Sequence, residues 1–303
     1  MNIYDVIIMG GGPAGLNAAI VLGRCRRKVL LFDHGKQRNR HSHGMHNYLT
    51  RDDILPAEFL LISHKELKKY GIKILHKEIK HARKKEEGIF ELRDCDGKIY
   101  HSKKLILATG LTDILPKING AEQFYGKSMF HCPYCDGWEV ANKKIGVYSK
   151  NKSGIEVALT LTTWTTDITL YTDGRRYVRP KNQKKLEEKN ITVVNDRLHS
   201  LQGNKGKLKN IVLKNGESCR CDALFFSNGY EVQCDLVESL GCNVGKNNVA
   251  LTNRSQQTNI PGLYVAGDAA REMHFVVVAA AEGAKAGVYV NKELLNEYDL
   301  KQS

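Results

Sequence analysis

Hydrophobic and glycine positions in the first part of the chain follow a strand, turn, helix and strand order. The run YDVIIM at 4–9 is apolar enough for a strand buried on both faces of a sheet, and three glycines follow it at 10–12. A helix-like segment, AGLNAAIVLGRC at 14–25, and a second apolar run, KVLLFD at 28–33, complete the unit. Because parallel strands need a crossover that is usually a helix, this order predicts the start of a doubly wound parallel sheet.

The same order of elements returns in the middle of the chain. KKIGVY at 143–148 predicts a strand, a helix is expected near 154–163, and DITLY at 167–171 predicts the next strand. Two further apolar runs that end in glycine, LILATG at 105–110 and ALFFSNG at 223–229, resemble each other. The two units therefore look like a degenerate internal duplication of one nucleotide-binding fold.

The carboxyl-terminal part resumes the first unit. GLYVAGDAA at 262–270 predicts a strand and a turn, and the small-residue segment 277–294 predicts a helix after it. We therefore predict an α/β fold with two Rossmann-like nucleotide-binding domains, the second inserted in the first. Crossings between them are expected near Pro116 and near 240–250. The predicted domains are residues 1–117 with 245–303, and residues 118–244.

The composition is that of an ordinary soluble protein, with 42% of the 303 residues hydrophobic and 26% charged. No apolar run approaches the roughly 20 residues that would span a bilayer, so no membrane partner is expected. The amino terminus lacks the basic start, apolar stretch and small-residue cleavage site of a secretory signal. The expected location is therefore cytoplasmic.

The net charge is +13, from 46 basic and 33 acidic residues. Basic residues are mixed with acids, as in KKEE at 84–87 and KKLEEK at 184–189, and no recognition motif for nucleic acid accompanies them. Nucleic acid is therefore not expected as a partner. Long-range attraction of an acidic protein is the interpretation that this charge favours.

The first glycine run carries a dinucleotide-binding fingerprint between a predicted strand and a predicted helix. Gly10 permits the tight turn, Gly12 lets the backbone approach a pyrophosphate, and Gly15 allows close packing of helix on strand. Asp33 ends the next strand, where a carboxylate accepts hydrogen bonds from the adenosine ribose. With these parts in register, the fingerprint predicts a bound dinucleotide rather than a glycine-rich turn without ligand. The candidate residues are Gly10, Gly12, Pro13, Ala14, Gly15 and Asp33.

Two distant segments favour FAD over NAD at this site. Ala108-Thr109-Gly110 closes a predicted strand with a turn near the nucleotide, and Gly267-Asp268 closes another just before the small-residue helix. Asp268 can accept hydrogen bonds from a ribityl chain, and the following helix can direct its amino terminus at the flavin and the pyrophosphate. Taken alone, Asp268 could also be a plain helix cap.

Two cysteines lie three residues apart in HCPYCDGWE, at Cys132 and Cys135. In a reducing compartment such a pair is more often catalytic or metal-binding than structural. The pair can be a redox-active disulfide, or it can join Cys219 and Cys221 in a zinc site with four thiolates. The first is favoured, because structural zinc sites usually use wider spacing than Cys219-x-Cys221. The remaining cysteines are single: Cys25, Cys95, Cys234 and Cys242.

Together, these motifs resemble the thioredoxin reductase family of flavin disulfide oxidoreductases over essentially the whole chain. The resemblance is carried by Gly10/Gly12/Gly15, Asp33, Ala108-Thr109-Gly110, Cys132-x-x-Cys135-Asp136-Gly137 and Gly262 through Asp268. It implies non-covalent FAD in the outer domain, the cysteine pair on the inserted domain, and a homodimer. It also implies a rotation of the inserted domain that carries the pair between the flavin and a dithiol substrate.

Within the family, HCPYCDGWE is similar to the motif of dithiol oxidases that close the disulfides of gliotoxin- and holomycin-type natural products. Further segments resemble that branch: Arg38-Asn39, Met45-His46-Asn47, Arg51-Asp52 and Leu161-x-x-Trp164. The resemblance also adds Asn47 to the expected cofactor-binding residues.

Roles for the motif residues are likewise implied by the resemblance. Cys135 would face the flavin as a charge-transfer thiolate, and Cys132 would attack the disulfide of the partner. Asp136 would move the proton between thiol and solvent or substrate. His131 can assist this transfer, or it can be a surface residue beside the motif.

The middle unit departs from the family where a nicotinamide cofactor would bind. Ser149-Lys150-Asn151 stands where three glycines belong, and side chains there would crowd a pyrophosphate. Thr172-Asp173-Gly174 replaces the arginine pair that reads the 2′-phosphate of NADPH. One interpretation is NADPH bound by a remodelled loop, through Lys150, Lys152, Arg175 and Arg176. The others are electron transfer from dithiol through flavin to oxygen, and electron delivery by an acidic carrier such as ferredoxin.

We therefore predict an enzyme, an FAD-dependent thiol–disulfide oxidoreductase that uses Cys132 and Cys135 and has no metal. The alternative enzyme is a thioredoxin reductase driven by NADPH or ferredoxin. The alternatives outside enzymes are a flavin-bound regulatory or nucleic-acid-binding protein and a zinc-stabilised interaction module. The expected substrate is a dithiol or disulfide, in a thioredoxin-like protein or in a small molecule.

Overall fold

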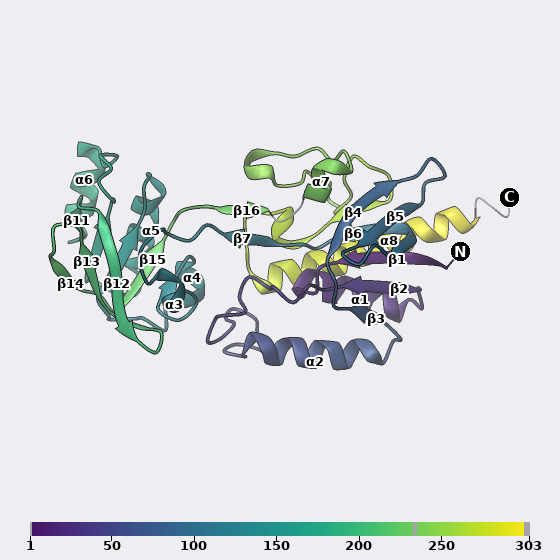
Figure 1. Ribbon diagram of the computed structural model, residues 1–303, viewed down its shortest axis with the longest axis horizontal. Helices are drawn as coiled ribbons and strands as arrows, with labels where there is room; N and C mark the ends of the chain where they lie inside the picture. Colours follow the sequence, from purple (N-terminus) through teal and green to yellow (C-terminus); the bar gives the residue numbers. More distant parts are fainter. Residues whose placement is uncertain (1, 233–234, 300–303) are drawn as a thin grey trace.

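The computed structural model describes residues 2–232 and 235–299, and Figure 1 shows two α/β units side by side. The outer unit consists of the elements β1 to β6 and α7 to α8, and the inserted unit runs from α3 to β15. The start of β1 and the end of α8 lie at the side of the outer unit away from the inserted unit. The α/β class and the insertion of one nucleotide-binding fold in another are therefore as the sequence predicted.

A seven-stranded mixed sheet forms the centre of the outer unit. Its order is β3-β2-β1-β6-β5-β4; β5 pairs with the first half of β6 and β17 with the second half. Met9 of β1 lies opposite Leu107 of β6, which lies opposite Val265 of β17, so the carboxyl ends of these parallel strands meet at one edge. The strands are β1 (Ile3–Met9), β2 (Val29–Phe32), β3 (Lys73–Leu75), β4 (Ile79–Lys84), β5 (Phe90–Asp94), β6 (Ile99–Leu107) and β17 (Leu263–Val265).

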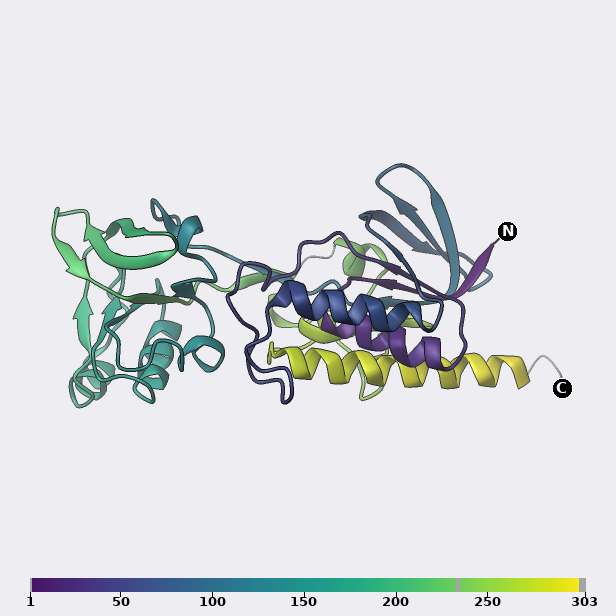
Figure 2. The same ribbon diagram turned by 90° about the horizontal axis from the view of Figure 1, so that it is seen from below.

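Helices cover one face of this sheet. Figure 2 shows three of them lying side by side: α1 (Pro13–Arg24), α2 (Pro56–Lys68) and α8 (Val276–Asp299). Val6 and Ile8 of β1 point into the core under these helices, and the alternate residues point to the other face, as the two-residue period of a strand requires.

The predicted small-residue helix is α8, which continues beyond the predicted end at residue 294. Its small residues permit a close approach to α1, because a Cβ at Gly283 would lie only 1.9 Å from the carbonyl oxygen of Ala14. The contact brings α8 directly against the helix that follows the first glycine turn.

The opposite face of the outer sheet packs against the segment that follows the second crossing. This segment contains α7 (Asp235–Ser239) and η1 (Lys246–Asn248), and Leu236, Leu240 and Ala250 share a buried core with Ile7. The packing favours a second crossing before α7, earlier than the expected 240–250. The hydrophobic pattern of a short apolar helix does not indicate which sheet the helix will cover. We accordingly propose that the inserted unit ends near β16 rather than at residue 244.

The inserted unit has a five-stranded parallel sheet in the order β11-β10-β9-β15-β8. Its strands are β8 (Met129–Phe130), β9 (Ile145–Tyr148), β10 (Ile168–Tyr171), β11 (Thr192–Val194) and β15 (Ala223–Phe226). One face packs against α5 (Ser153–Leu161) and α6 (Pro180–Glu187). The other packs against an antiparallel sheet of β12 (Leu198–Asn204), β13 (Lys207–Leu213) and β14 (Ser218–Arg220). Two short helices, α3 (Ala121–Phe124) and α4 (Pro133–Asp136), flank β8.

Two strands form the connection between the units (Figure 1). β7 (Leu111–Asp113) leads out of the outer unit and β16 (Tyr230–Val232) leads back to it. They pair antiparallel, with Asp113 opposite Tyr230. The side chains of this ribbon therefore lie at the junction, where Asp113 takes part in the site described below.

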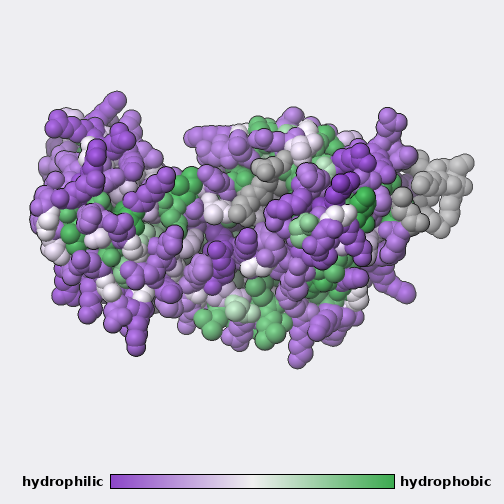
Figure 3. All heavy atoms as spheres, in the orientation of Figure 1, coloured by the Kyte–Doolittle hydropathy of each residue, from purple (hydrophilic) through white to green (hydrophobic). Residues whose placement is uncertain are grey.

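The surface is mainly hydrophilic on the face shown in Figure 3, in keeping with the charged composition, and hydrophobic residues gather at the middle of its lower edge. Large exposed hydrophobic side chains include Leu49, Leu61 and Trp138. Within residues 2–232 and 235–299, no helix has the length and apolar character needed to cross a membrane.

Candidate active site

The turn between β1 and α1 forms a cradle for an anion. Gly10 has a left-handed backbone (φ 112°), and a Cβ there would lie 2.0 Å from the carbonyl oxygen of Ala108. At Gly12, by contrast, no heavy atom of the described residues lies within 4 Å of a Cβ position, so the backbone is open to a ligand. No described side chain caps the start of α1, which leaves its first amide groups and the positive end of its dipole available.

One pocket, here called the cofactor pocket, brings together most of the residues predicted to bind the dinucleotide. They are Gly10, Gly12, Pro13, Ala14, Asp33, Ala108, Thr109, Gly110, Gly267 and Asp268. Gly15 lies behind the turn, where a Cβ would come within 1.8 Å of the Gly10 carbonyl oxygen, as expected of a packing position. The hydroxyl of Thr109 is buried and has no hydrogen-bond partner in the described part of the chain, so it is available to a ligand.

Asp33 follows β2 and its side chain is almost fully buried. Oδ1 accepts a hydrogen bond from the backbone amide of Gly35 (2.9 Å), and Nε2 of Gln37 donates to both carboxylate oxygens (3.0 Å each). A carboxylate can accept about four hydrogen bonds in all, so Asp33 keeps acceptor capacity toward the pocket that it lines.

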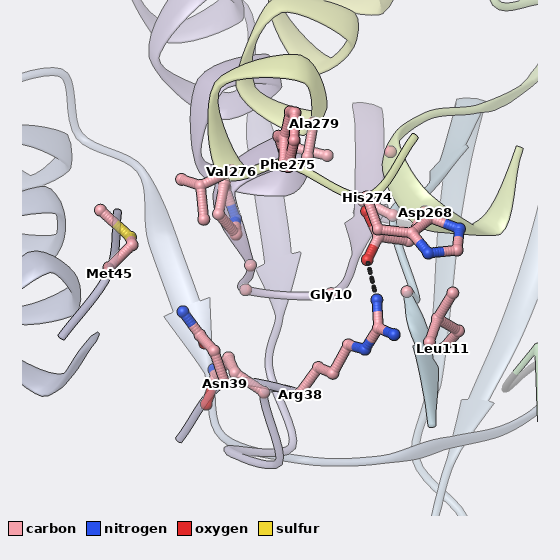
Figure 4. A pocket seen from close by; sticks show the side chains of 18 of the residues that line it. Gly10, Arg38, Asn39, Met45, Leu111, Asp268, His274, Phe275, Val276 and Ala279 are labelled. Carbon is pink, nitrogen blue, oxygen red and sulfur yellow. Dashed lines mark hydrogen bonds and ion pairs between the residues drawn. The ribbon is translucent and has the colours of Figure 1, made fainter. Parts of the chain in front are cut away.

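Asp268 lies in η2 (Gly267–Ala269), the turn after β17. Figure 4 shows Arg38 reaching toward it, with Nη1 3.4 Å from Oδ2 and His274 beside the pair. Burial raises the pKa of Asp268, against the opposing effect of His274 and Arg38. A carboxyl group held in this way suits a polyol, because its protonated form donates a hydrogen bond and its ionised form accepts.

The cysteine pair is a disulfide that lies between two cavities. Cys132 immediately precedes α4, Cys135 lies within it, and their sulfur atoms are bonded. Cys135 lines the cofactor pocket together with Asp136, whereas Cys132 lines a second cavity. In this one conformation, Cys135 therefore borders the cofactor pocket while Cys132 borders the second cavity.

This second cavity, here called the junction cavity, has a volume of about 740 Å³, in the range of sites for small organic ligands. Tyr134 and Met273 are largely exposed (64% and 61%), so the cavity opens to solvent beside Cys132. Its lining is mainly apolar: Pro133, Tyr134, Phe226, Tyr230, Met273 and Phe275. Arg38, His131 and His274 line both cavities and so form the wall between them.

Asp136, the acid directly after Cys135, is in the environment of a proton carrier. Burial, reinforced by the negative charge of Glu139, raises the pKa of Asp136 to about 7. Oε1 of Glu139 lies 3.6 Å from Nε2 of His46, a residue that also lines the cofactor pocket. A carboxyl group that titrates near neutral pH can both take up and release a proton.

A buried carboxylate that no sequence motif marked, Asp113, joins the two units at this site. Nε and Nη2 of Arg38 donate hydrogen bonds to it (2.9 and 2.5 Å), and the hydroxyl of Tyr125 donates a third (2.6 Å). Burial opposes ionisation of this acid, but the hydrogen bonds from Arg38 outweigh it and lower the pKa of Asp113. Because Asp113 stands in a short strand with no neighbouring motif, only its burial and its partners reveal it.

His131 is placed by the same carboxylate, with Nδ1 3.4 Å from Oδ2 of Asp113. Burial, reinforced by the positive charge of Arg38, lowers the pKa of His131 to about 4, so the imidazole is neutral at pH 7. The residue is partly buried in the wall between the cavities, which favours a role at the site over a plain surface position.

Asn47 lies outside the lining of the cofactor pocket. Its side-chain amide donates a hydrogen bond to the carbonyl oxygen of Tyr134 (2.9 Å), so it ties the loop before α2 to the cysteine motif. The loop is strained, since Asn47, Thr50 and Asp53 all have left-handed backbones (φ 63°, 73° and 63°), and a β-branched residue rarely adopts one. The cofactor role that the resemblance implies for Asn47 stays a prediction.

The corresponding turn of the inserted unit, between β9 and α5, is filled by its own side chains. Ser149 is fully buried, its hydroxyl donates to the carbonyl oxygen of Asn151 (3.0 Å), and the Tyr177 hydroxyl donates to the Ser149 carbonyl (3.1 Å). Lys150 pairs with Asp173 at 3.2 Å. A pyrophosphate at this turn would have to displace these contacts.

The other cysteines that the structure describes do not join the pair. The buried Cys221 thiol donates to the carbonyl oxygen of Ala223 (3.0 Å), and Cys219 lies on β14 in the antiparallel sheet. Among the residues that the structure describes, no group of three or more His, Cys, Asp or Glu side chains could hold a metal ion. Cys234 lies outside the described residues.

Known proteins match this chain across both units. The family model described as pyridine nucleotide-disulphide oxidoreductase matches residues 4–283. The chain is similar to the thioredoxin reductase tcpT of Claviceps purpurea, with 30% identity over 313 residues, 100% of this chain and 98% of that protein. Two solved structures are also similar. HlmI has 29% identity and a TM-score of 0.95, covering 99% of this chain and 95% of its own. An oxidoreductase from Agrobacterium tumefaciens has 33% identity and a TM-score of 0.90, covering 97% and 99%.

Proposed function

Because this chain belongs to the pyridine nucleotide-disulphide oxidoreductase family and is a thioredoxin reductase-like enzyme, we propose that it oxidises a small dithiol with bound FAD. The observation that carries this proposal is the placement of the disulfide. Cys132 lines an open, mainly apolar cavity and Cys135 lines the cofactor pocket. A dithiol that enters the junction cavity therefore meets one sulfur, while the other faces the space for the cofactor.

The cofactor pocket suits FAD at three places. The open backbone at Gly12 and the uncapped start of α1 suit a pyrophosphate. Asp33 keeps acceptor capacity for a ribose, and the Thr109 hydroxyl and the Asp268 carboxyl lie along the wall for the rest of the molecule. When bound, FAD supplies a two-electron acceptor for the dithiol couple and can return the electron pair to oxygen.

The cysteine chemistry follows from the side that each sulfur faces. A substrate thiolate attacks Sγ of Cys132, which forms a mixed disulfide, breaks the bond between Cys132 and Cys135, and releases Cys135 as a thiolate. The second substrate thiolate then attacks the substrate sulfur of the mixed disulfide and releases Cys132. The substrate leaves as a disulfide after losing two electrons and two protons, and the cysteine pair has gained the two electrons.

The two protons leave by different routes. Asp136, beside Cys135 and with a pKa of about 7, accepts one near neutral pH. The other passes from the substrate thiol to solvent at the open side of the junction cavity, because the lowered pKa of His131, about 4, makes its imidazole a weak base. His131 lies 3.4 Å from Asp113 and, being neutral, can hydrogen-bond the substrate thiol without taking up its proton.

Oxygen, rather than NADPH, is the second redox partner that we propose. The turn where NADPH would bind is occupied by the hydrogen bonds of Ser149 and by the Lys150–Asp173 pair. One dithiol and one oxygen molecule would then give one disulfide and one hydrogen peroxide. A reductase driven by NADPH or by an acidic carrier is the second candidate, favoured by the exposed Arg175 and Arg176 near this turn.

Anaerobic titration of the oxidised protein, followed by flavin absorbance, tests the proposal. Dithiothreitol and an aromatic dithiol should bleach the flavin, NADPH and NADH should not, and hydrogen peroxide should form in equal amount to oxidised dithiol when air is admitted. Rapid bleaching by NADPH would favour the reductase. Purified protein that does not bind FAD would overturn the proposal altogether.

Narrowing the junction cavity tests the substrate class. Met273→Trp places a larger side chain at its open side and should raise the KM for the aromatic dithiol while leaving FAD binding unchanged. Leu251→Trp, at an exposed position that does not line either cavity, is the matched control. Equal kcat/KM values for both variants would contradict binding in this cavity.

A homodimer completes the proposal, on the strength of the family resemblance. The mass of one chain is 34.1 kDa, and sedimentation velocity should show a species of twice that mass. A monomer at micromolar concentration would contradict it.

A further inference from the structure

Glu282 is a buried carboxylate on α8, outside the lining of the cofactor pocket and only 8% exposed. Its Oε2 accepts a hydrogen bond from the backbone amide of Gly267 (3.0 Å), and its Oε1 pairs with Nε of Arg271. Glutamate is almost never fully buried unless it is paired, so the contacts of Glu282 must account for a carboxylate at this buried position.

The other two guanidinium nitrogens of Arg271 also donate hydrogen bonds, and these fix the position of its side chain. Nη1 donates to the carbonyl oxygen of Ala270 (2.6 Å) and to the hydroxyl of Thr252 (2.9 Å). Nη2 donates to the side-chain oxygen of Gln256 (2.6 Å), which is itself fully buried. All three nitrogens are used, so the guanidinium orients Glu282 from a fixed position.

The backbone amide that Glu282 holds belongs to the turn that carries Asp268. Gly267 has a left-handed backbone (φ 79°), and a Cβ there would lie 2.9 Å from the Cβ of Ala14 in the first turn of α1. Val276, at the start of α8, lines the same pocket as Asp268 (Figure 4). Glu282 thus links the turn to the helix whose amino terminus faces the pocket.

We propose that Glu282 and Arg271 are positioning residues for the cofactor: by holding the amide of Gly267, they fix Asp268 relative to the amino terminus of α8. The inference rests on FAD as the proposed cofactor. A buried ion pair often adds little net stability compared with well-packed apolar residues, so precise placement of the turn is the better account of this pair.

The experiment compares Glu282→Gln and Glu282→Ala with Glu293→Gln. Glu293 lies on the same helix, accepts hydrogen bonds from Lys104 Nζ (2.6 Å) and the Tyr264 hydroxyl (2.5 Å), and does not line the cofactor pocket. It therefore reports the general effect of removing a hydrogen-bonded acid from α8. The measurements are the FAD dissociation constant of the apoprotein, the visible spectrum of bound flavin, and the melting temperature of the apoprotein.

Glutamine at position 282 keeps one acceptor oxygen, but its NH₂ group would face either the Gly267 amide or the Arg271 guanidinium, both of which are donors. Glu282→Gln should therefore weaken FAD binding about tenfold. Glu282→Ala loses both contacts and should weaken it further, and both should shift the flavin spectrum. Glu293→Gln should lower the melting temperature with an unchanged FAD dissociation constant.

An FAD dissociation constant in Glu282→Gln equal to that of the wild type would overturn the inference, and so would equal weakening by Glu293→Gln. If Glu282→Ala does not fold, the FAD dissociation constant of Glu282→Gln alone tests the inference. A wild-type protein that binds no FAD is a different result, because it refutes the proposed function itself.

Discussion

Arg38 donates two hydrogen bonds to Asp113 and also lies 3.4 Å from Asp268. One guanidinium therefore holds a carboxylate of the connecting ribbon and a carboxylate of the cofactor turn. The Arg38 side chain is only 14% exposed and that of Asp113 only 3%. This pairing ties the orientation of the inserted unit, and with it the disulfide, to the cofactor pocket.

Asp113→Asn should destabilise the protein by about 3–5 kcal/mol, because it leaves the buried Arg38 without its main partner. Urea unfolding measures the free energy. Glu78→Gln, which removes an exposed pair with Lys80, is the control and should lower the unfolding free energy far less. Equal changes in the unfolding free energy for the two substitutions would show that the buried pair stabilises the protein no more than the exposed pair does.

Asp136→Asn should change the dependence of stability on pH. The pKa of Asp136 is raised from 3.8 to about 7, so between these values the folded protein binds more protons than the unfolded chain. The unfolding free energy of the wild type therefore falls as pH rises through this window. Asparagine does not titrate, so the unfolding free energy of Asp136→Asn should not show this fall. Its melting temperature should exceed that of the wild type by more at about pH 8 than at about pH 5.

The same pKa should appear in the kinetics. Flavin reduction by a dithiol should speed up as pH rises through about 7 in the wild type, and Asp136→Asn should lose this inflection. Asp167→Asn, at an exposed carboxylate, is the control for both measurements and should follow the wild type. A parallel pH profile for Asp136→Asn would refute its role as proton acceptor.

Two alanine substitutions should separate the roles of the first glycines. Gly12→Ala meets no described atom within 4 Å, so the protein should fold normally but bind FAD weakly, because the methyl group occupies the open backbone. Gly15→Ala would place its Cβ 1.8 Å from the Gly10 carbonyl oxygen, so it should lower the melting temperature of the apoprotein as well. Thermal melts and FAD titration of both variants check this, and equal melting temperatures would contradict the packing role.

Serine substitutions should distinguish the two sulfur atoms. Because Cys135 lines the cofactor pocket, Cys132→Ser should show long-wavelength thiolate–flavin absorbance, and Cys135→Ser should not. Both variants should keep FAD and lose dithiol turnover. Cys219→Ser should keep turnover, and full turnover in either of the first two variants would refute the disulfide mechanism.

Much of the site was predictable because its parts are local. The spacing of Gly10, Gly12 and Gly15 follows from one turn between a strand and a helix, and the flanking apolar runs correspond to β1, α1 and β2. Cys132 and Cys135 can bond because residues three apart on one helical turn are neighbours. None of these relationships depends on how the two units meet.

Other parts could not be predicted, because their importance lies in distant partners. Asp113 is 75 positions from Arg38 in the chain, and Glu282 on α8 accepts a hydrogen bond from the backbone amide of Gly267, 15 positions before it. The position of the second crossing depends on distant contacts too, since the residues of α7 reveal which core they join only once they are packed.

By itself the sequence determined the order of strands and helices, the two nucleotide-binding folds and the place of the disulfide, because these depend on hydrophobic period and on short-range backbone geometry. Only the tertiary structure decided that Cys132 and Cys135 face different cavities and that Arg38 meets two acids. The first relationship arises from the docking of one unit on the other. The second arises because segments 75 and 230 positions apart in the chain fold onto one site, and no local pattern of residues encodes either.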